Sequence, residues 1–283
     1  MSLGYGGANG RAHVTCDYET RMGKFRLGAV ALLAWLILGA SAACAGETRC
    51  WLDKGAVVVP AVFGDIAGDF LLDLARPVSA VHDTRANADG LSGAAATRTL
   101  RLAGEDLGPV TLPIVDLDSQ TRDFDTTING VLGADLFADR ILTLDFRDGG
   151  CRLGLARRAR LPRGARLDVQ YVGGVPAIRA VLSDGTKSRE GLFSLGTAQA
   201  ATIISRAHLA RADSAAAPAR LRALELAGRL FEQIPAQVGP GPGGLSGAIG
   251  SAILAHGRLT LDGRRGVLIL TDKGYLPWDQ TSP

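Results

Sequence analysis

An internal duplication constrains the fold of this 283-residue chain more than any other feature of its sequence. Three segments recur in the same order and at nearly equal offsets, and the last of them recurs without a gap. The pairs are residues 70–81 with 193–204, 100–104 with 224–228, and 128–145 with 245–262. Ordered repeats of this kind indicate a structural unit that occurs twice. The sequence therefore predicts two similar lobes.

The hydrophobic pattern of both halves predicts strands. Apolar or alternating runs are short and are separated by Gly-rich turns, which is typical of β structure. The predicted strands are residues 57–63, 70–72, 100–102, 110–115 and 141–146, with turns at 64–68, 103–104 and 148–150. Residues 218–234 are rich in Ala, Leu and Arg, but their Leu-x-Leu-Ala-Gly motif favours a hairpin over a helix. The expected fold class is all-β.

The domain boundaries follow from the repeats and from the composition between them. The expected parts are a leader at 1–45, a first lobe at 46–155, an Arg-rich linker at 156–168, a second lobe at 169–274 and a tail at 275–283. The linker holds five arginines around Pro162 and Gly164. This segment is either a patch for an anionic surface or a solvated linker, and the lack of interleaved aromatic residues favours the linker.

The first 45 residues have the order of a secretory signal peptide. A basic segment at 21–26 precedes an uncharged apolar run at 27–45, which ends in the small-x-small triplet Ala43-Cys44-Ala45. Met22 is a candidate for the true start of the chain. A retained membrane anchor and lipidation at Cys44 are the alternatives to cleavage. We expect an exported protein, periplasmic or secreted.

Cysteine usage agrees with export. Removal of residues 1–45 leaves Cys50 and Cys151, and two cysteines in an oxidising compartment are expected to form a disulfide. No C-x-x-C motif occurs, and the four scattered histidines lack ligand spacing, so we expect no metal and no cofactor.

Composition and motifs argue against other function classes. A formal charge of +3 and an aromatic content of 5% indicate neither the basic surface nor the stacking residues of a nucleic-acid-binding protein. Residues 239–244 formally match G-x-G-x-x-G, but Pro240 and Pro242 lack the N–H groups that a phosphate loop needs. The G-x-S-x-G motif of serine hydrolases and the P-loop motif of NTPases are both absent from the sequence.

The repeated segments resemble the loops of pepsin- and retropepsin-like aspartic proteases. In that family an apolar-x-apolar-Asp-Thr-Gly-Ala loop is followed later by an apolar-apolar-Gly segment. Phe70-Leu-Leu-Asp73 is similar to the first loop, and Phe193-Ser-Leu-Gly196-Thr197-Ala198 holds the place of the second. Residues 130–133 and 247–250, each Gly-x-x-Gly, resemble the partner segments. The resemblance covers residues 56–270 and implies two pepsin-like β-barrel lobes with a cleft between them.

The resemblance also implies a damaged catalytic pair. Peptide hydrolysis in this family needs two carboxylates that share one proton, so that one acts as base while the other stays protonated. Asp73 supplies one carboxylate, whereas Gly196 at the matching position has no side chain. Without its partner, Asp73 is expected to be catalytically silent.

Neighbouring loop positions have changed as well. Leu74 replaces the Thr whose hydroxyl joins the two loops in the family, while Thr197 retains it. Ala75 and Ala198 replace the loop Gly, which lacks a Cβ and so permits close backbone approach.

Three functions remain open. The first is an inactive aspartic-protease-like protein that binds a peptide or protein in the interlobe cleft, and the second is an active peptidase with an unusual dyad. The second needs another acid near Asp73 (Asp69, Asp83 or Asp184), or a dimer that joins two Asp73 residues. The third is a structural exported β protein without a cleft function. Nucleic acid and metal are not expected partners, and a membrane is expected only with a retained signal or a lipidated Cys44.

Overall fold

The computed structural model of the chain describes residues 46–209 and 220–271. The predicted leader at 1–45 and the predicted tail at 275–283 lie outside the described residues. Most of the described chain is β-strand, in two closed barrels and one sheet that the two lobes share. The prediction of an all-β chain with two similar lobes is confirmed.

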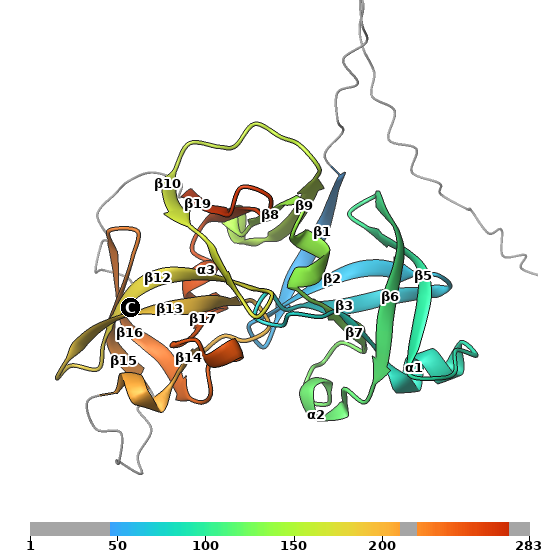
Figure 1. Ribbon diagram of the computed structural model, residues 1–283, viewed down its shortest axis with the longest axis horizontal. Coiled ribbons are helices and arrows are strands. Elements are labelled where there is room, and N and C mark those ends of the chain that lie inside the picture. Colours follow the sequence, from blue (N-terminus) through green and yellow to red (C-terminus); the bar gives the residue numbers. More distant parts are fainter. Residues whose placement is uncertain (1–45, 210–219, 272–283) are drawn as a thin grey trace, which may run out of the picture. The chain divides into compact units, whose positions relative to one another are not determined.

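The first lobe is a closed six-stranded barrel (Figure 1). Around the barrel the strands follow the order β2, β3, β7, β4, β6 and β5, and β5 pairs back onto β2. Two short helices lie in its loops. The bounds are β2 Ala56–Phe63, β3 Ile66–Leu72, β4 Ala80–His82, α1 Asp83–Ala88, β5 Ala95–Leu102, β6 Glu105–Val115, α2 Asp118–Thr121 and β7 Ile128–Leu132.

The second lobe repeats this barrel strand for strand. Its order is β12, β13, β17, β14, β16 and β15, and β15 closes onto β12. Both lobes have the same two parallel pairings, β3–β7 and β4–β6 in the first and β13–β17 and β14–β16 in the second. The bounds are β12 Val175–Ser183, β13 Ser188–Gly196, β14 Thr202–Ile204, β15 Arg220–Leu226, β16 Arg229–Val238 and β17 Gly247–Gly250.

The tips of the β5–β6 and β15–β16 hairpins show how local sequence sets the repeat. Ala103 and Gly104 have φ values of 53° and 77°, and Ala227 and Gly228 have 57° and 76°. Two consecutive residues with positive φ form the turn whose twist matches antiparallel strands. The second hairpin confirms the strand prediction for the Ala- and Leu-rich segment.

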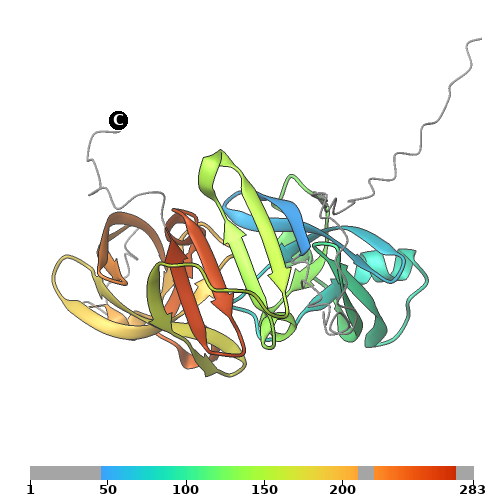
Figure 2. The same cartoon turned by 90° about the horizontal axis from the view of Figure 1, so that it is seen from above.

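A six-stranded antiparallel sheet belongs to both lobes, and its strands can be followed in Figure 2. Its order is β10, β19, β18, β8, β9 and β1. The central pair is β8–β18, in which Thr143 lies opposite Thr260. These two residues occupy the same place in the sequence repeat, so an approximate two-fold axis passes between them. The bounds are β1 Gly46–Asp53, β8 Ile141–Asp145, β9 Cys151–Ala156, β10 Ala165–Asp168, β18 Arg258–Asp262 and β19 Val267–Thr271.

Further short elements complete the chain. Strand β11 (Gln170–Val172) pairs with β12, and helix α3 (Ser251–Leu254) follows β17. Four 3-10 turns lie at η1 Ala134–Phe137, η2 Arg147–Gly149, η3 Arg206–His208 and η4 Pro242–Gly244. Buried apolar side chains fill the barrels, and Phe63, Phe70 and Phe193 are among the largest fully buried ones.

The disulfide between Cys50 and Cys151 is present. The two cysteines lie directly opposite each other on β1 and β9, at one side of the shared sheet. The bond joins the first and last strands of the first lobe. A disulfide is compatible with an exported protein.

Two expected boundaries differ from the structure. The turn predicted at 64–68 occupies only Gly64 and Asp65, and β3 begins at Ile66. Gly68 lies within β3, where the Asn129 side chain leaves no space for a Cβ. The Arg-rich segment predicted as a linker contains β10, because the exposed edge of β19 offers it a pairing partner. Among the described residues no helix is long and apolar enough to cross a membrane.

Candidate functional site

Two loops occupy equivalent places at the ends of parallel strand pairs. The Asp73 loop (residues 73–76) follows β3, where Leu72 lies opposite Leu132 of β7. The Gly196 loop (residues 196–199) starts at the last residue of β13, where Gly196 lies opposite Gly250 of β17. The N–H of Asp73 donates to the Leu132 carbonyl at 2.9 Å. The repeated topology therefore brings Asp73 and Gly196 to corresponding sites in the two lobes.

The Gly-x-x-Gly segments allow this arrangement because other backbone passes close behind them. A Cβ on Gly130 would lie 2.4 Å from the Ala80 carbonyl oxygen, and one on Gly250 would lie 2.2 Å from that of Ala200. Neither position has space for a side chain. Glycine at these positions is thus a packing requirement in both lobes.

The Thr197 side chain connects the two loops. Its hydroxyl donates to the Leu72 carbonyl at 2.7 Å and accepts the Leu74 N–H at 3.0 Å. Thr197 and Leu74 are both fully buried. Leu74 has no hydroxyl to make the reciprocal contact, so the connection runs from the second lobe to the first only. Thr197 also accepts a 2.8 Å hydrogen bond from the Val57 N–H through its carbonyl.

The Asp73 carboxylate sits in a turn of its own loop. Its Oδ1 accepts the N–H of Ala75 at 3.0 Å, and its backbone carbonyl accepts the N–H of Arg76. Burial raises the pKa of the Asp73 carboxyl, against the opposing effects of the Ala75 N–H and the Arg76 charge. Asp73 is half-buried.

The Gln199 side chain takes up the space next to Gly196. A Cβ on Gly196 would lie 3.1 Å from Gln199 Nε2, 3.1 Å from the Ile249 carbonyl oxygen and 3.3 Å from Ala248 Cβ. Gln199 Nε2 is buried and has no hydrogen-bond acceptor in the structure. An amide nitrogen with two unused donors therefore lies beside the place where the Cβ of a second acid would stand. Ala198, between these two residues, is half-buried.

The three acids considered as substitutes for the second carboxylate lie elsewhere. Asp69 lies on β3, where it pairs with Pro60 of β2. It precedes Asp73 by four residues, which separates the two Cα atoms by on the order of 13 Å along an extended strand. Asp83 accepts the Thr84 N–H at the start of α1, and Asp184 accepts two N–H groups in the turn after β12. Across residues 46–209 and 220–271, no carboxylate forms a hydrogen bond with Asp73.

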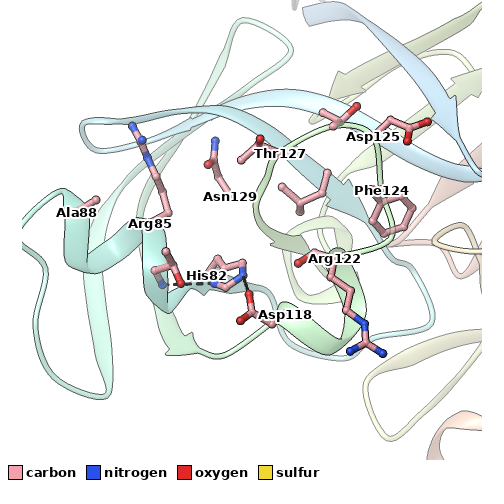
Figure 3. Close-up of a pocket in the computed structure, with 13 residues that line it drawn as sticks. His82, Arg85, Ala88, Asp118, Arg122, Phe124, Asp125, Thr127 and Asn129 are labelled. Carbon is pink, nitrogen blue, oxygen red and sulfur yellow. Dashed lines mark hydrogen bonds and ion pairs between the residues drawn. The ribbon is translucent and has the colours of Figure 1, made fainter.

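A pocket of about 460 Å³ lies beside α1, α2 and the start of β7 in the first lobe (Figure 3). Its lining includes His82, Arg85, Asp118, Phe124 and Asn129. The buried His82 ring contacts Asp83 Oδ1 at 2.9 Å through Nδ1 and Asp118 Oδ1 at 3.1 Å through Nε2. With a carboxylate at each ring nitrogen, His82 fixes the pocket wall and leaves no nitrogen for a ligand.

This pocket is connected to the Asp73 loop through α2. The guanidinium of Arg76 donates to Gln120 Oε1 at 3.1 Å, and Gln120 lies between the pocket residues Asp118 and Thr121. From the sequence alone, His82 is one of four scattered histidines. The adjacent His82-Asp83 pair was visible in the sequence, but the approach of Asp118 depends on how the loop before β7 folds.

The described part of the chain contains no group of three or more His, Cys, Asp or Glu side chains that could hold a metal ion. No family model matches the chain, and no curated protein matches its sequence.

Proposed function

We propose that this chain is an exported, pepsin/retropepsin-like protein that has lost aspartic protease activity and binds peptide segments of other proteins across the Asp73 and Gly196 loops. The observation that carries the proposal concerns the Gly196 loop, which presents no carboxylate at position 196. The Gln199 amide lies next to that position instead. A proton-sharing pair cannot form from Asp73 alone.

The two loops suit peptide binding without hydrolysis. The Asp73 carboxylate can accept a peptide N–H. The buried, unpartnered Gln199 amide can donate to a peptide carbonyl once its side chain turns toward the peptide. A peptide unit has one donor and one acceptor, so this pair matches it. The pocket beside α2, linked to the Asp73 loop by Arg76, is of a size to receive a side chain of that peptide.

Peptide hydrolysis from pH 3 to pH 7 tests the loss of activity. The substrates are mixed-sequence peptides, and the proteins are the full-length wild type, Asp73→Asn, Gly196→Asp and Gly196→Asp/Gln199→Ala. We expect equal background from wild type and Asp73→Asn. The double variant is included because the Cβ of an acid at position 196 would lie 3.1 Å from Gln199 Nε2, which would have to move. Turnover by wild type that disappears in Asp73→Asn would establish the alternative, an active peptidase with a second acid outside the standard position.

Binding is measured on the same proteins with fluorescently labelled peptides. Asp73→Asn is expected to weaken binding roughly 10-fold, since a hydrogen bond to a charged group contributes about 1.5–3 kcal/mol. Asp65→Asn removes an exposed carboxylate from the β2–β3 turn and serves as the matched control. Unchanged affinity in Asp73→Asn, or equal losses in both variants, would reject the loop as the binding site and leave a structural role.

A further inference from the structure

Four arginines from two distant parts of the chain line one pocket on the shared sheet. The pocket has a volume of about 350 Å³, and Arg157, Arg158, Arg264 and Arg265 contribute to its wall together with Asp262 and Ile141. All four arginines are exposed. The pocket lies away from the Asp73 loop and involves none of its residues.

Sheet register explains why these arginines meet. Ile141 of β8 lies opposite Asp262 of β18 on one side and opposite Ala156 of β9 on the other. Arg157 and Arg158 directly follow Ala156, while Arg264 and Arg265 form the turn that follows Asp262. Both arginine pairs therefore leave the same end of three neighbouring strands, and rigid strands position them.

The charges in this pocket are unbalanced. Asp262 is buried, and both of its carboxylate oxygens are occupied by Arg265, through the backbone N–H and the guanidinium, each at 3.1 Å. No ion pair or hydrogen bond to Arg157, Arg158 or Arg264 occurs within the described ranges. Three guanidinium groups thus face one small cavity without a counter-charge.

The equivalent end of the repeat shows a different arrangement. Asp145 takes the place of Asp262 there, and it accepts hydrogen bonds from both Arg147 and Arg258. At the Asp262 end, Ile141 stands where Arg258 stands at the other. The repeat therefore keeps one end as an internal ion-pair network and leaves the other with surplus arginines.

We propose that the pocket formed by Arg157, Arg158, Arg264 and Arg265 binds a multiply charged phosphate- or sulfate-type oxyanion. Guanidinium forks match the oxygen geometry of such groups and bind them in bidentate fashion. A carboxylate ligand carries one negative charge and would need only one guanidinium, whereas three unpaired ones fit a group with two charges and several acceptor oxygens. The same chemistry is found in free phosphate and in a lipid phosphomonoester headgroup such as that of phosphatidic acid.

Isothermal titration of the full-length protein with sodium phosphate, sodium sulfate and sodium acetate tests the site. We expect saturable binding of phosphate or sulfate and at least 10-fold weaker binding of acetate. The triple variant Arg157→Gln/Arg158→Gln/Arg264→Gln should bind phosphate at least 10-fold more weakly. Arg49→Gln/Arg101→Gln/Arg222→Gln, which removes three exposed arginines elsewhere, should stay within 2-fold of wild type. Since the three pocket arginines have no partner to lose, the melting temperature of the triple variant should equal that of wild type.

A vesicle arm distinguishes the two sources of the oxyanion. Sedimentation with vesicles that contain phosphatidic acid, lost in the pocket triple variant and absent with phosphatidylcholine alone, would support the site with a lipid phosphomonoester headgroup as its ligand. Phosphate binding without sedimentation would support it with a soluble ligand. Equal affinity of wild type and the pocket triple variant for phosphate and for vesicles, or equal losses in both triple variants, would overturn the proposal.

Discussion

Thr197 shows how one side chain can couple two lobes. Its hydroxyl is both a donor and an acceptor, and it serves the Leu72 carbonyl and the Leu74 N–H in a fully buried position. Buried backbone groups that lose their partners destabilise a fold more than the same groups in water. A single hydroxyl therefore satisfies two buried backbone groups of the first lobe, beside the backbone hydrogen bond from the Val57 N–H to the Thr197 carbonyl.

Thr197→Val is expected to lower the free energy of unfolding by about 2–4 kcal/mol, because two buried backbone groups lose their partner. Thr197→Ser retains the hydroxyl and should lose less than half of that. Urea denaturation of the two variants and wild type gives the comparison. Equal losses in both variants would show that the methyl group, and not the hydroxyl, provides the stabilisation.

Asp73→Asn should alter stability in a pH-dependent way. Burial raises the pKa of Asp73, so the folded state binds this proton more tightly than the unfolded state does. The contribution of Asp73 is then most favourable below the ordinary carboxyl pKa of about 3.9 and declines as pH rises through the raised value. Asn cannot ionise, and its Oδ1 can still accept the Ala75 N–H.

The variant should therefore be more stable than wild type at pH 7, and the difference should shrink toward pH 3. Chemical denaturation at both pH values measures it. A variant that is less stable than wild type at pH 7 would mean that the ionised carboxylate is itself stabilised by the fold.

At the scale of elements, Asp145 ties β8 to β18. Hydrogen bonds from Arg147 and then from Arg258 hold the pKa of Asp145 well below its usual range. A carboxyl with a lowered pKa adds stability that is fully present above its unfolded pKa and is lost as pH falls toward the folded value. This network lies next to the two-fold axis, where the lobes pair.

Asp145→Asn is expected to destabilise the protein by about 2 kcal/mol at pH 7, within the range for hydrogen bonds to charged groups. Glu190→Gln is the contrasting variant, since it breaks the exposed ion pair with Arg179 and should change stability by about 0–1 kcal/mol. The difference between wild type and Asp145→Asn should narrow below pH 4. Equal effects of the two variants at pH 7 would contradict this prediction and show that Asp145 contributes no more stability than an exposed ion pair.

Local sequence predicted the hairpins but not every strand. The Leu-x-Leu-Ala-Gly motifs carry their own turn chemistry, so the β5–β6 and β15–β16 hairpins could be anticipated. Strand β10 could not, because residues 156–168 are rich in Arg and turn-forming residues, and only the edge of β19 makes Ala165–Asp168 a strand. Pairing across the sheet, not propensity, decides such segments.

The candidate sites divide in the same manner. The correspondence of Asp73 with Gly196 follows from the repeat and is visible in the sequence. The place of the Gln199 amide depends on a side-chain rotamer, and the meeting of Arg157 with Arg264 depends on strand register. Neither feature can be predicted from the spacing of residues in the sequence.

At the scale of the whole molecule, the disulfide between Cys50 and Cys151 closes a long loop. The cysteines are 101 residues apart and join the strands that begin and end the first lobe. In the chain-entropy model, a disulfide that closes a loop of about 100 residues raises the free energy of unfolding by roughly 4–5 kcal/mol. The second lobe has no disulfide among the described residues, so the stabilisation is concentrated in the first.

Cys50→Ser/Cys151→Ser should therefore lower the free energy of unfolding by about 4 kcal/mol in the chain-entropy model. Reducing agent should lower the melting temperature of wild type toward that of the variant and leave the variant unchanged. Mass analysis of the unreduced protein should show no free thiol at these positions. Two alkylatable thiols in the native protein would contradict the bond.

The β8–β18 pairing has a consequence for how the two lobes could diverge. Equivalent residues face each other across the axis at Thr143 and Thr260, which is the pattern of an isologous interface between identical subunits. In such a symmetric pair every side chain appears on both sides at once, so an acid such as Asp73 would be present in both loops or in neither. Fusion of the copies into one polypeptide removes that restriction. The presence of Asp73 in one loop and Gly196 in the other, and of the arginine pocket at one end of the sheet, are asymmetries that a pair of identical lobes could not carry.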